Sequence, residues 1–207
     1  MKAHELFSQM DTELASDIVG YFRKESREIY KTTVASLSMQ RKLRPVFVQK
    51  KPAEAQIAWL VKTLKMRNAN TVGEHLLQVW LLKAQQALLI DFLDAMEIEH
   101  DDEGAVENLP ESIEKEKLDP ALDLVLGKHD PRVVTLYMRV FQMQQAGGWP
   151  GIAEALESDK RLVISNTTAE TQKTSKLEAK AEAEAEEADP TEKVDGSPSK
   201  KEDGATS

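Results

Sequence analysis

The chain has 207 residues, of which 41% are hydrophobic, and it carries a formal net charge of −9 at pH 7. It contains no cysteine, which excludes disulfides, thiolate catalysis and cysteine-based zinc or iron–sulfur sites. The N-terminal MKAHELFSQM lacks an apolar signal core, and charged and amide side chains interrupt the most apolar run, 76–96, so we expect a cytoplasmic protein without a membrane span.

A helical spacing of apolar residues dominates the first part of the chain. Residues 2–10 predict a short helix. A longer apolar stripe of the same period then predicts one continuous helix over residues 12–37. Asp11 or Thr12 is suited to cap it, because a side-chain oxygen there can accept a first-turn amide.

Residues 41–52 interrupt this helical pattern. Pro45 pushes the preceding residue out of the α region, so the long helix must end before it. The β-branched and aromatic run 46–48 favours an extended segment, and without other strand signals we expect an ordered loop. The stretch carries five cations and no acid, and the cations are the candidate binding residues: Arg41, Lys42, Arg44, Lys50 and Lys51.

The middle of the chain predicts further helices. Pro52 is well placed to start one of them, and Asn70 or Thr71 can cap the next. The run 72–96 predicts either two helices joined by a tight turn or one long kinked helix. Its polar face is narrow, so we expect it to be the central buried element. An acidic connector follows over residues 97–116.

Two Asp-Pro pairs, Asp119-Pro120 and Asp130-Pro131, each predict a helix start, because Asp is a good cap and proline suits the first helical position. Gly147-Gly148 predicts a stop, and residues 150–156 a last short helix. No segment beyond 46–48 alternates with period two. The predicted fold class is therefore all-α, a compact multi-helix body of antiparallel helix pairs.

A shift of 45 residues places the apolar pattern of 77–96 on that of 122–141. This period is typical of HEAT- and armadillo-type helix pairs. A solenoid needs three or more units, however, and the chain offers two. Chance alignment of two amphipathic helix pairs is the alternative interpretation.

The composition changes after Ile164. We predict an all-α domain over residues 1–164 and a disordered acidic tail over 165–207, rich in Ala, Glu and Lys and then in Ser and Pro, with a net charge of −5. Within the domain, residues 31–67 sum to +8 and residues 91–119 to −10. Such asymmetry bears on partners and association rates rather than on fold.

No motif in the chain indicates catalysis. Residues 99–110 align partly with a calcium-binding EF loop, but Pro110 stands where the bidentate Glu is required. The four histidines lack zinc spacing, and no activated nucleophile is evident. We therefore expect no catalytic residue, no metal and no cofactor, although catalytic residues scattered along the sequence would escape this pattern search.

The basic stretch carries the functional expectation. If the following helix folds back, Lys31, Lys62, Lys65 and Arg67 would extend it into one positive face over residues 31–67. Such a face binds an acidic protein surface or a phosphate backbone, or it is simply solvated. Only Phe47 in it could stack a base. We expect a non-catalytic helical adaptor with a protein partner, with nucleic-acid or ribonucleoprotein backbone binding as the alternative; the oligomeric state is not predicted.

Overall fold

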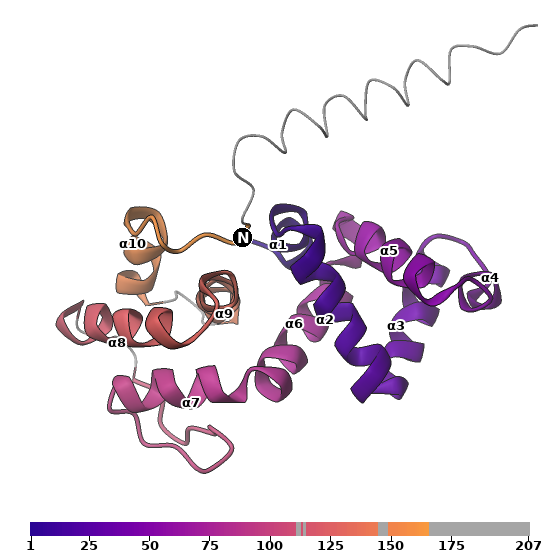
Figure 1. Ribbon diagram of the computed structural model, residues 1–207. Helices are drawn as coiled ribbons and strands as arrows, with labels where there is room; N and C mark the ends of the chain where they lie inside the picture. The colour runs from indigo at the N-terminus through magenta and orange to yellow at the C-terminus, as the bar shows by residue number, and fades with distance from the viewer. Residues whose placement is uncertain (111–112, 114, 145–148, 166–207) are drawn as a thin grey trace, which may run out of the picture. The chain divides into compact units, whose positions relative to one another are not determined.

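Helices account for all the regular secondary structure in the described part of the chain, which comprises residues 1–110, 113, 115–144 and 149–165 of a computed structural model (Figure 1). All of these residues belong to one compact unit, Met1–Asn166. The predicted all-α class is confirmed. The predicted tail lies outside the described residues, apart from Ser165.

The helices are, in chain order, α1 (Ala3–Gln9), α2 (Thr12–Glu25), α3 (Arg27–Gln40), α4 (Pro45–Gln49), α5 (Ala53–Leu64), the short 3-10 helix η1 (Arg67–Ala69), α6 (Asn70–Ala84), α7 (Gln86–Ala95), α8 (Lys115–Lys128), α9 (Pro131–Gln144) and α10 (Pro150–Ser158).

The predicted single helix over residues 12–37 is wrong, because the chain leaves the helix at Ser26 (φ −139°, ψ 65°). The amide of Ser26 still donates to the carbonyl of Phe22 at 3.0 Å, so α2 closes normally. The break lets α2 pack against α5 and α6 while α3 packs against α4. Phe22 and Tyr30, on either side of it, are both buried.

The expected loop over residues 46–48 is also wrong, because Pro45–Gln49 forms the short helix α4. Arg44 is extended (ψ 129°), as a residue before proline should be. Pro45 then takes the first helical position, where its missing N–H removes no bond and its fixed φ suits the helix. Val48 is buried by this turn, whereas its two neighbours are exposed.

Two helices, α6 and α7, form the predicted central element, and the chain bends by 76° between them. Leu76, Leu77 and Trp80 of α6 are buried, and this helix contacts α1, α2, α7 and α9. None of the helices in the described ranges is by itself long and apolar enough to cross a membrane. Residues 67–84 and 86–95 meet that test of length and composition only when counted together as a bent pair.

The two Asp-Pro pairs behave differently. Asp130 caps α9 as predicted, since its carboxylate accepts from the Arg132 amide at 2.8 Å. Helix α8, by contrast, begins at Lys115, so the predicted start at Asp119 is wrong and Pro120 lies inside the helix. Pro120 lies in the second turn of α8, where its missing N–H removes a single backbone hydrogen bond. Packing of the added first turn, which begins at Lys115, offsets that loss. The predicted stop at Gly147-Gly148 lies outside the described residues.

The 45-residue echo aligns helices but does not build a solenoid. The shift moves α6 and α7 onto the bounds of α8 and α9. In a solenoid, equivalent helices would stack, α6 on α8 and α7 on α9. The main packing is instead crosswise, with α7 on α8 and α6 on α9.

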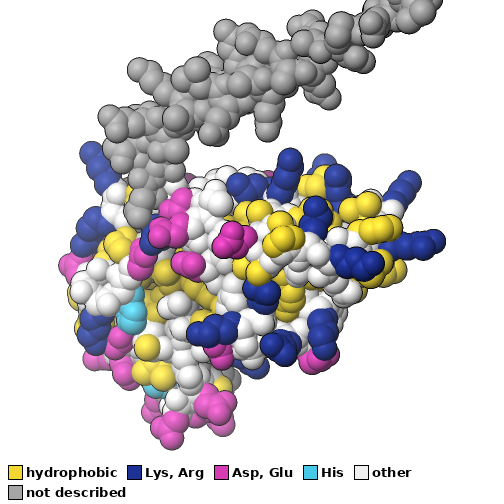
Figure 2. Space-filling model, turned by 45° about the vertical axis from the view of Figure 1, so that its right-hand side comes forward, with side chains coloured by type: hydrophobic (Ala, Val, Ile, Leu, Met, Phe, Trp, Pro, Cys, Tyr) yellow, Lys and Arg dark blue, Asp and Glu magenta, His cyan; other side chains and the backbone are white. Residues whose placement is uncertain are grey.

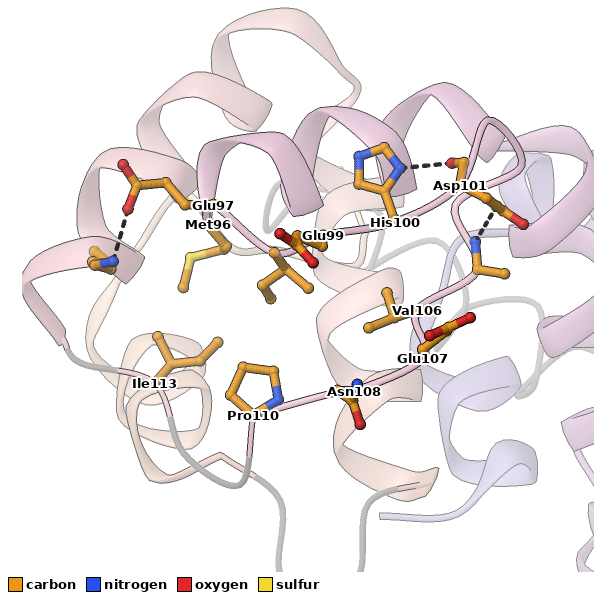
Figure 3. Close-up of a pocket in the computed structure, with 13 residues that line it drawn as sticks. Met96, Glu97, Glu99, His100, Asp101, Val106, Glu107, Asn108, Pro110 and Ile113 are labelled. Carbon is orange, nitrogen blue, oxygen red and sulfur yellow. Dashed lines mark hydrogen bonds and ion pairs between the residues drawn. The ribbon is translucent and has the colours of Figure 1, made fainter.

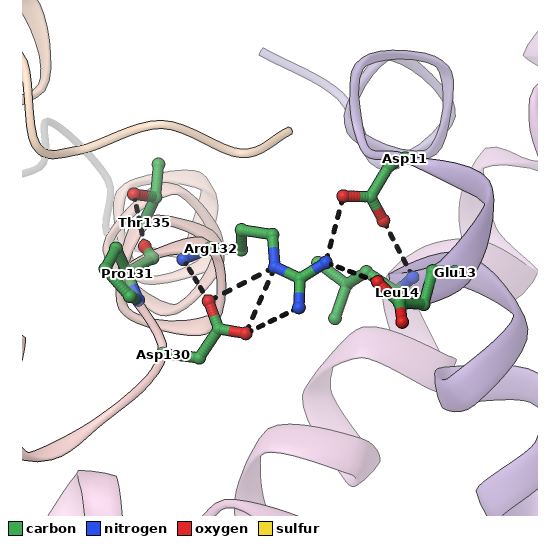
Figure 4. Close-up of polar contacts among 7 residues, drawn as sticks. All are labelled: Asp11, Glu13, Leu14, Asp130, Pro131, Arg132 and Thr135. Atoms are coloured by element: carbon green, nitrogen blue, oxygen red, sulfur yellow. Dashed lines mark hydrogen bonds and ion pairs between the residues drawn. The ribbon is translucent and has the colours of Figure 1, made fainter. Parts of the chain in front are cut away.

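The guanidinium of Arg132 joins the start of α9 to the start of α2 (Figure 4). It donates to Asp130 at 2.7 Å, to Asp11 at 3.0 Å and to Glu13 at 2.9 Å. Asp11 also caps α2 by accepting from the Leu14 amide at 2.8 Å. Arg132 therefore binds the capping carboxylates of two helices at once, and these carboxylates raise its own pKa.

We expect Arg132→Met to lower the free energy of unfolding by about 2 kcal/mol, because it removes hydrogen bonds between charged groups in a largely buried place. The control is Arg161→Met. Arg161 pairs similarly with Asp159 and Asp123, but its side chain is 55% exposed, against 15% for Arg132. That substitution should change stability by less than about 1 kcal/mol.

Urea unfolding of both variants measures these losses, and equal losses would contradict a special role for Arg132. Hydrogen bonding to Arg132 lowers the pKa of Asp130 from its ordinary 3.8. This stabilisation is present above that pH and is lost as the pH falls below it. The difference between wild type and Arg132→Met should therefore shrink in acid.

Candidate interaction surface

The five predicted binding residues lie at the two ends of α4, in a segment that we call the α4 tip, residues 39–51. Arg41 and Lys42 form the turn that ends α3, and Arg44 precedes α4. Lys50 and Lys51 follow α4, and all five side chains are exposed. None of them makes an ion pair with another residue in the described ranges.

Apolar side chains are also exposed at the α4 tip, which the sequence analysis did not foresee. Half of the eight large exposed apolar side chains in the described part of the chain lie here: Met39 (72% exposed), Leu43 (41%), Val46 (44%) and Phe47 (61%). Figure 2 shows Lys and Arg side chains interleaved with apolar ones toward its right-hand side. The tip is thus an apolar patch among unpaired cations.

Polar contacts behind the patch hold the tip in place. The amide nitrogen of Gln56 donates to the carbonyls of Gln49 and Lys51 at 3.0 and 2.7 Å. The amide oxygen of Gln56 accepts from the Tyr30 hydroxyl at 2.9 Å. Val48 is buried beneath α4. The backbone of the tip is therefore tied to α3 and α5, so its exposed side chains project from a fixed support.

Lys42 occupies a backbone conformation that favours glycine. Helix α3 ends in a Schellman motif, in which the amide of Leu43 donates to Ser38 at 2.8 Å and that of Lys42 to Met39 at 2.9 Å. Lys42 at its C′ position has φ 55°. The left-handed region is strained for a residue with a Cβ, so a cationic side chain is placed here at the expense of stability.

The wider positive face remains a prediction. Lys31 pairs with Glu28 at 2.9 Å and is therefore not a free cation. Lys62 is in the last turn of α5, and Arg67 begins η1. The five cations of the tip thus flank α4 along the chain, while Lys62 and Arg67 lie in the last turn of α5 and in η1.

We expect Lys42→Gly to raise the free energy of unfolding by about 0.5–1 kcal/mol, because glycine adopts positive φ without strain. Arg41→Gly is the control. Arg41 has φ −89°, which any residue adopts, so glycine there should be neutral or destabilising. Thermal and urea unfolding of the two variants provide the measurement. Stabilisation by both substitutions, or by neither, would contradict the role of the left-handed backbone.

A second surface feature follows α7, in the predicted acidic connector. Met96, Ile98, Val106, Pro110 and Ile113 contribute apolar lining to a groove of about 880 Å³, which we call the acidic groove (Figure 3). Its acidic side chains are Glu97, Glu99, Asp101 and Glu107. Glu97 pairs with Lys117 at 2.8 Å.

Hydrogen bonds within the loop that forms the groove hold its turn in place. The carboxylate of Asp101 accepts from the amides of Glu103 and Ala105 at 2.9 and 2.8 Å. Gly104 has φ 83°, and a Cβ there would lie 2.8 Å from a methyl carbon of Leu89. Glycine is therefore required both for the turn and for the close approach to α7.

His100 fastens this loop to α7. Its Nδ1 faces the carbonyl of Asp101 at 2.7 Å and its Nε2 faces the carboxylate of Asp94 at 3.1 Å. Only the imidazolium donates to both oxygens. These two bonds, the one to Asp101 first, raise the pKa of His100 above its ordinary 6.5. The protonated ring therefore stabilises the loop below pH 6.5, and that contribution is lost as the pH rises through the raised pKa.

We expect NMR titration of the His100 ring to give a pKa above 6.5 in the wild type and a lower one in Asp94→Asn, which removes the carboxylate partner. The decrease should be partial, because the larger contribution comes from the Asp101 carbonyl. Asp102→Asn is the control, since it removes a charge from the same loop without a bond to the ring. Equal decreases in both variants would show that general charge, and not this contact, sets the pKa.

The partial resemblance to a calcium loop gains no support. The Asp101 carboxylate is already used by loop amides. In the described ranges, no three His, Asp or Glu side chains are grouped in a way that could hold a metal ion. No family model, no curated protein and no solved structure matches this chain.

Proposed function

We propose that this chain is a non-catalytic helical binding module whose protein partner docks on the α4 tip. One observation carries the proposal: four exposed apolar side chains stand among five exposed cations that have no ionic partner in the described ranges. Desolvating an apolar patch provides affinity, and a ring of charge selects the partner and speeds encounter. The partner surface should accordingly be apolar with acidic residues around it.

The strained backbone at Lys42 supports a role for this segment. Residues held at positive φ without being glycine reduce stability and are found disproportionately at functional sites. The tip is also fixed from behind by Gln56, so little ordering entropy is lost when a partner binds.

The alternative function is binding to a nucleic-acid or ribonucleoprotein backbone. The unpaired cations favour it, because each can replace a condensed counterion on a phosphate backbone. Three of the four exposed apolar side chains at the tip are aliphatic or thioether groups, however, and only Phe47 can stack a base. Exposed aliphatic groups are better matched by a protein surface.

Affinity purification of the full chain with the double substitution Leu43→Ser and Phe47→Ser tests the apolar part of the proposal. We expect this variant to lose at least about tenfold in partner affinity, as is usual for central apolar contacts. Leu82→Ser with Leu124→Ser is the matched control, because these side chains are 58% and 40% exposed but lie outside the tip. Equal retention of partners by both variants would overturn the proposal.

Nuclease treatment separates the two functions. A protein partner should remain bound after nuclease and be lost when Arg41, Lys42, Arg44, Lys50 and Lys51 are all replaced by Gln. If nuclease removes every partner and the chain retains nucleic acid at about 50 mM salt, the backbone-binding function is correct instead.

A further inference from the structure

We propose that the partner of the α4 tip is a second copy of this chain, which receives the tip in its acidic groove. This inference rests on the proposed function, because it uses the same tip. It follows from a match in chemistry between two surfaces of one molecule, one apolar and basic, the other apolar and acidic.

The groove is suited to an insert that carries both apolar and cationic side chains. Its volume of about 880 Å³ lies toward the upper end of the roughly 300–1,000 Å³ found for pockets that hold a small ligand. It is therefore large enough for a few side chains rather than for a whole domain face. In Figure 3, Met96, Val106, Pro110 and Ile113 surround the open space. Such walls fit Leu43 and Phe47 of the tip.

The charges at the groove complement those of the tip. Glu99 and Glu107 are exposed in the lining and have no ion pair with another residue in the described ranges. Arg44 and Lys50 at the two ends of α4 are likewise exposed and unpaired. Docking would pair these groups around an apolar centre, which is the arrangement of a protein interface with a dry core and a polar rim.

Backbone strain marks the same two surfaces. The described chain has two non-glycine residues at positive φ, Lys42 (55°) and Glu97 (56°). Glu97 also occupies the C′ position of a Schellman motif, since the amide of Ile98 donates to Leu93 and that of Glu97 to Asp94, both at 3.0 Å. Each motif would be more stable with glycine. The C′ residue is a cation, Lys42, where the chain enters the α4 tip. It is an anion, Glu97, where the chain enters the loop that forms the acidic groove.

The positions of the two surfaces require association between chains. Helix α4 and the loop after α7 lie at opposite ends of the unit Met1–Asn166 (Figure 1). One copy therefore cannot fill its own groove. Contact between unlike surfaces is heterologous, so repeated docking gives a ring or an open head-to-tail filament rather than a two-fold dimer. The small contact makes each step weak.

Sedimentation of the full chain tests this directly. At about 50 mM salt the average mass should rise above that of the monomer as concentration increases toward about 100 µM. Reversing the tip (Arg44→Glu with Lys50→Glu) or the groove (Glu99→Lys with Glu107→Lys) should weaken self-association at least about tenfold. The fourfold variant that carries both reversals should recover it, as should an equimolar mixture of the two double variants.

Three results would overturn the inference. They are a monomeric wild type over this range, an unchanged association after groove reversal, and a failure of the fourfold variant to recover. The second would identify a different acidic occupant, such as the segment 165–207. If self-association is absent but the tip variants still lose another protein, the proposed function stands without this partner. If the tip variants lose nothing, both proposals fail.

Discussion

The structure depends on one cation placed between two helix starts. Arg132 binds Asp130, which caps α9, and Asp11, which caps α2, although these residues are far apart in sequence. One oxygen of a capping carboxylate accepts from a free amide of the first turn, and the second oxygen is available for another donor. By taking both second oxygens, one guanidinium ties the start of α2 to the start of α9. The crosswise packing of α6 on α9 and α7 on α8 is built within that frame.

Helix ends also explain where the α4 tip and the acidic groove lie. Helices α3 and α7 each stop in a Schellman motif with a charged C′ residue, Lys42 or Glu97. The motif turns the chain sharply, so the segment after it takes a new direction. In α3 the residue after the turn, Leu43, would normally pack on the side chain at C3. That residue is Ser38, whose buried hydroxyl offers no apolar contact, and Leu43 remains exposed.

The sequence predicted the parts of this fold that local chemistry determines. The all-α class, the cap at Asp130 and the bend within residues 72–96 all follow from periodicity and capping. The break at Ser26 was missed because the apolar stripe continues through it, and only packing against α5 and α6 shows why the helix must turn. The exposed state of Leu43 and Phe47 was missed for the same reason. An apolar residue has no local property that says whether another helix will cover it.

The separation of basic from acidic residues in this unit follows from the order of its helices along the chain. The basic run 31–67 and the acidic run 91–119 carry net charges of +8 and −10 within one chain. Helix α4 lies at the right-hand end of the unit Met1–Asn166 in Figure 1, whereas the loop after α7 lies along its lower left side. No ion pair joins a tip cation to a carboxylate of the acidic groove in the described ranges. In the proposed self-association their attraction is satisfied by a second copy, and an apolar centre beside each set of charges makes that contact stereospecific rather than merely electrostatic.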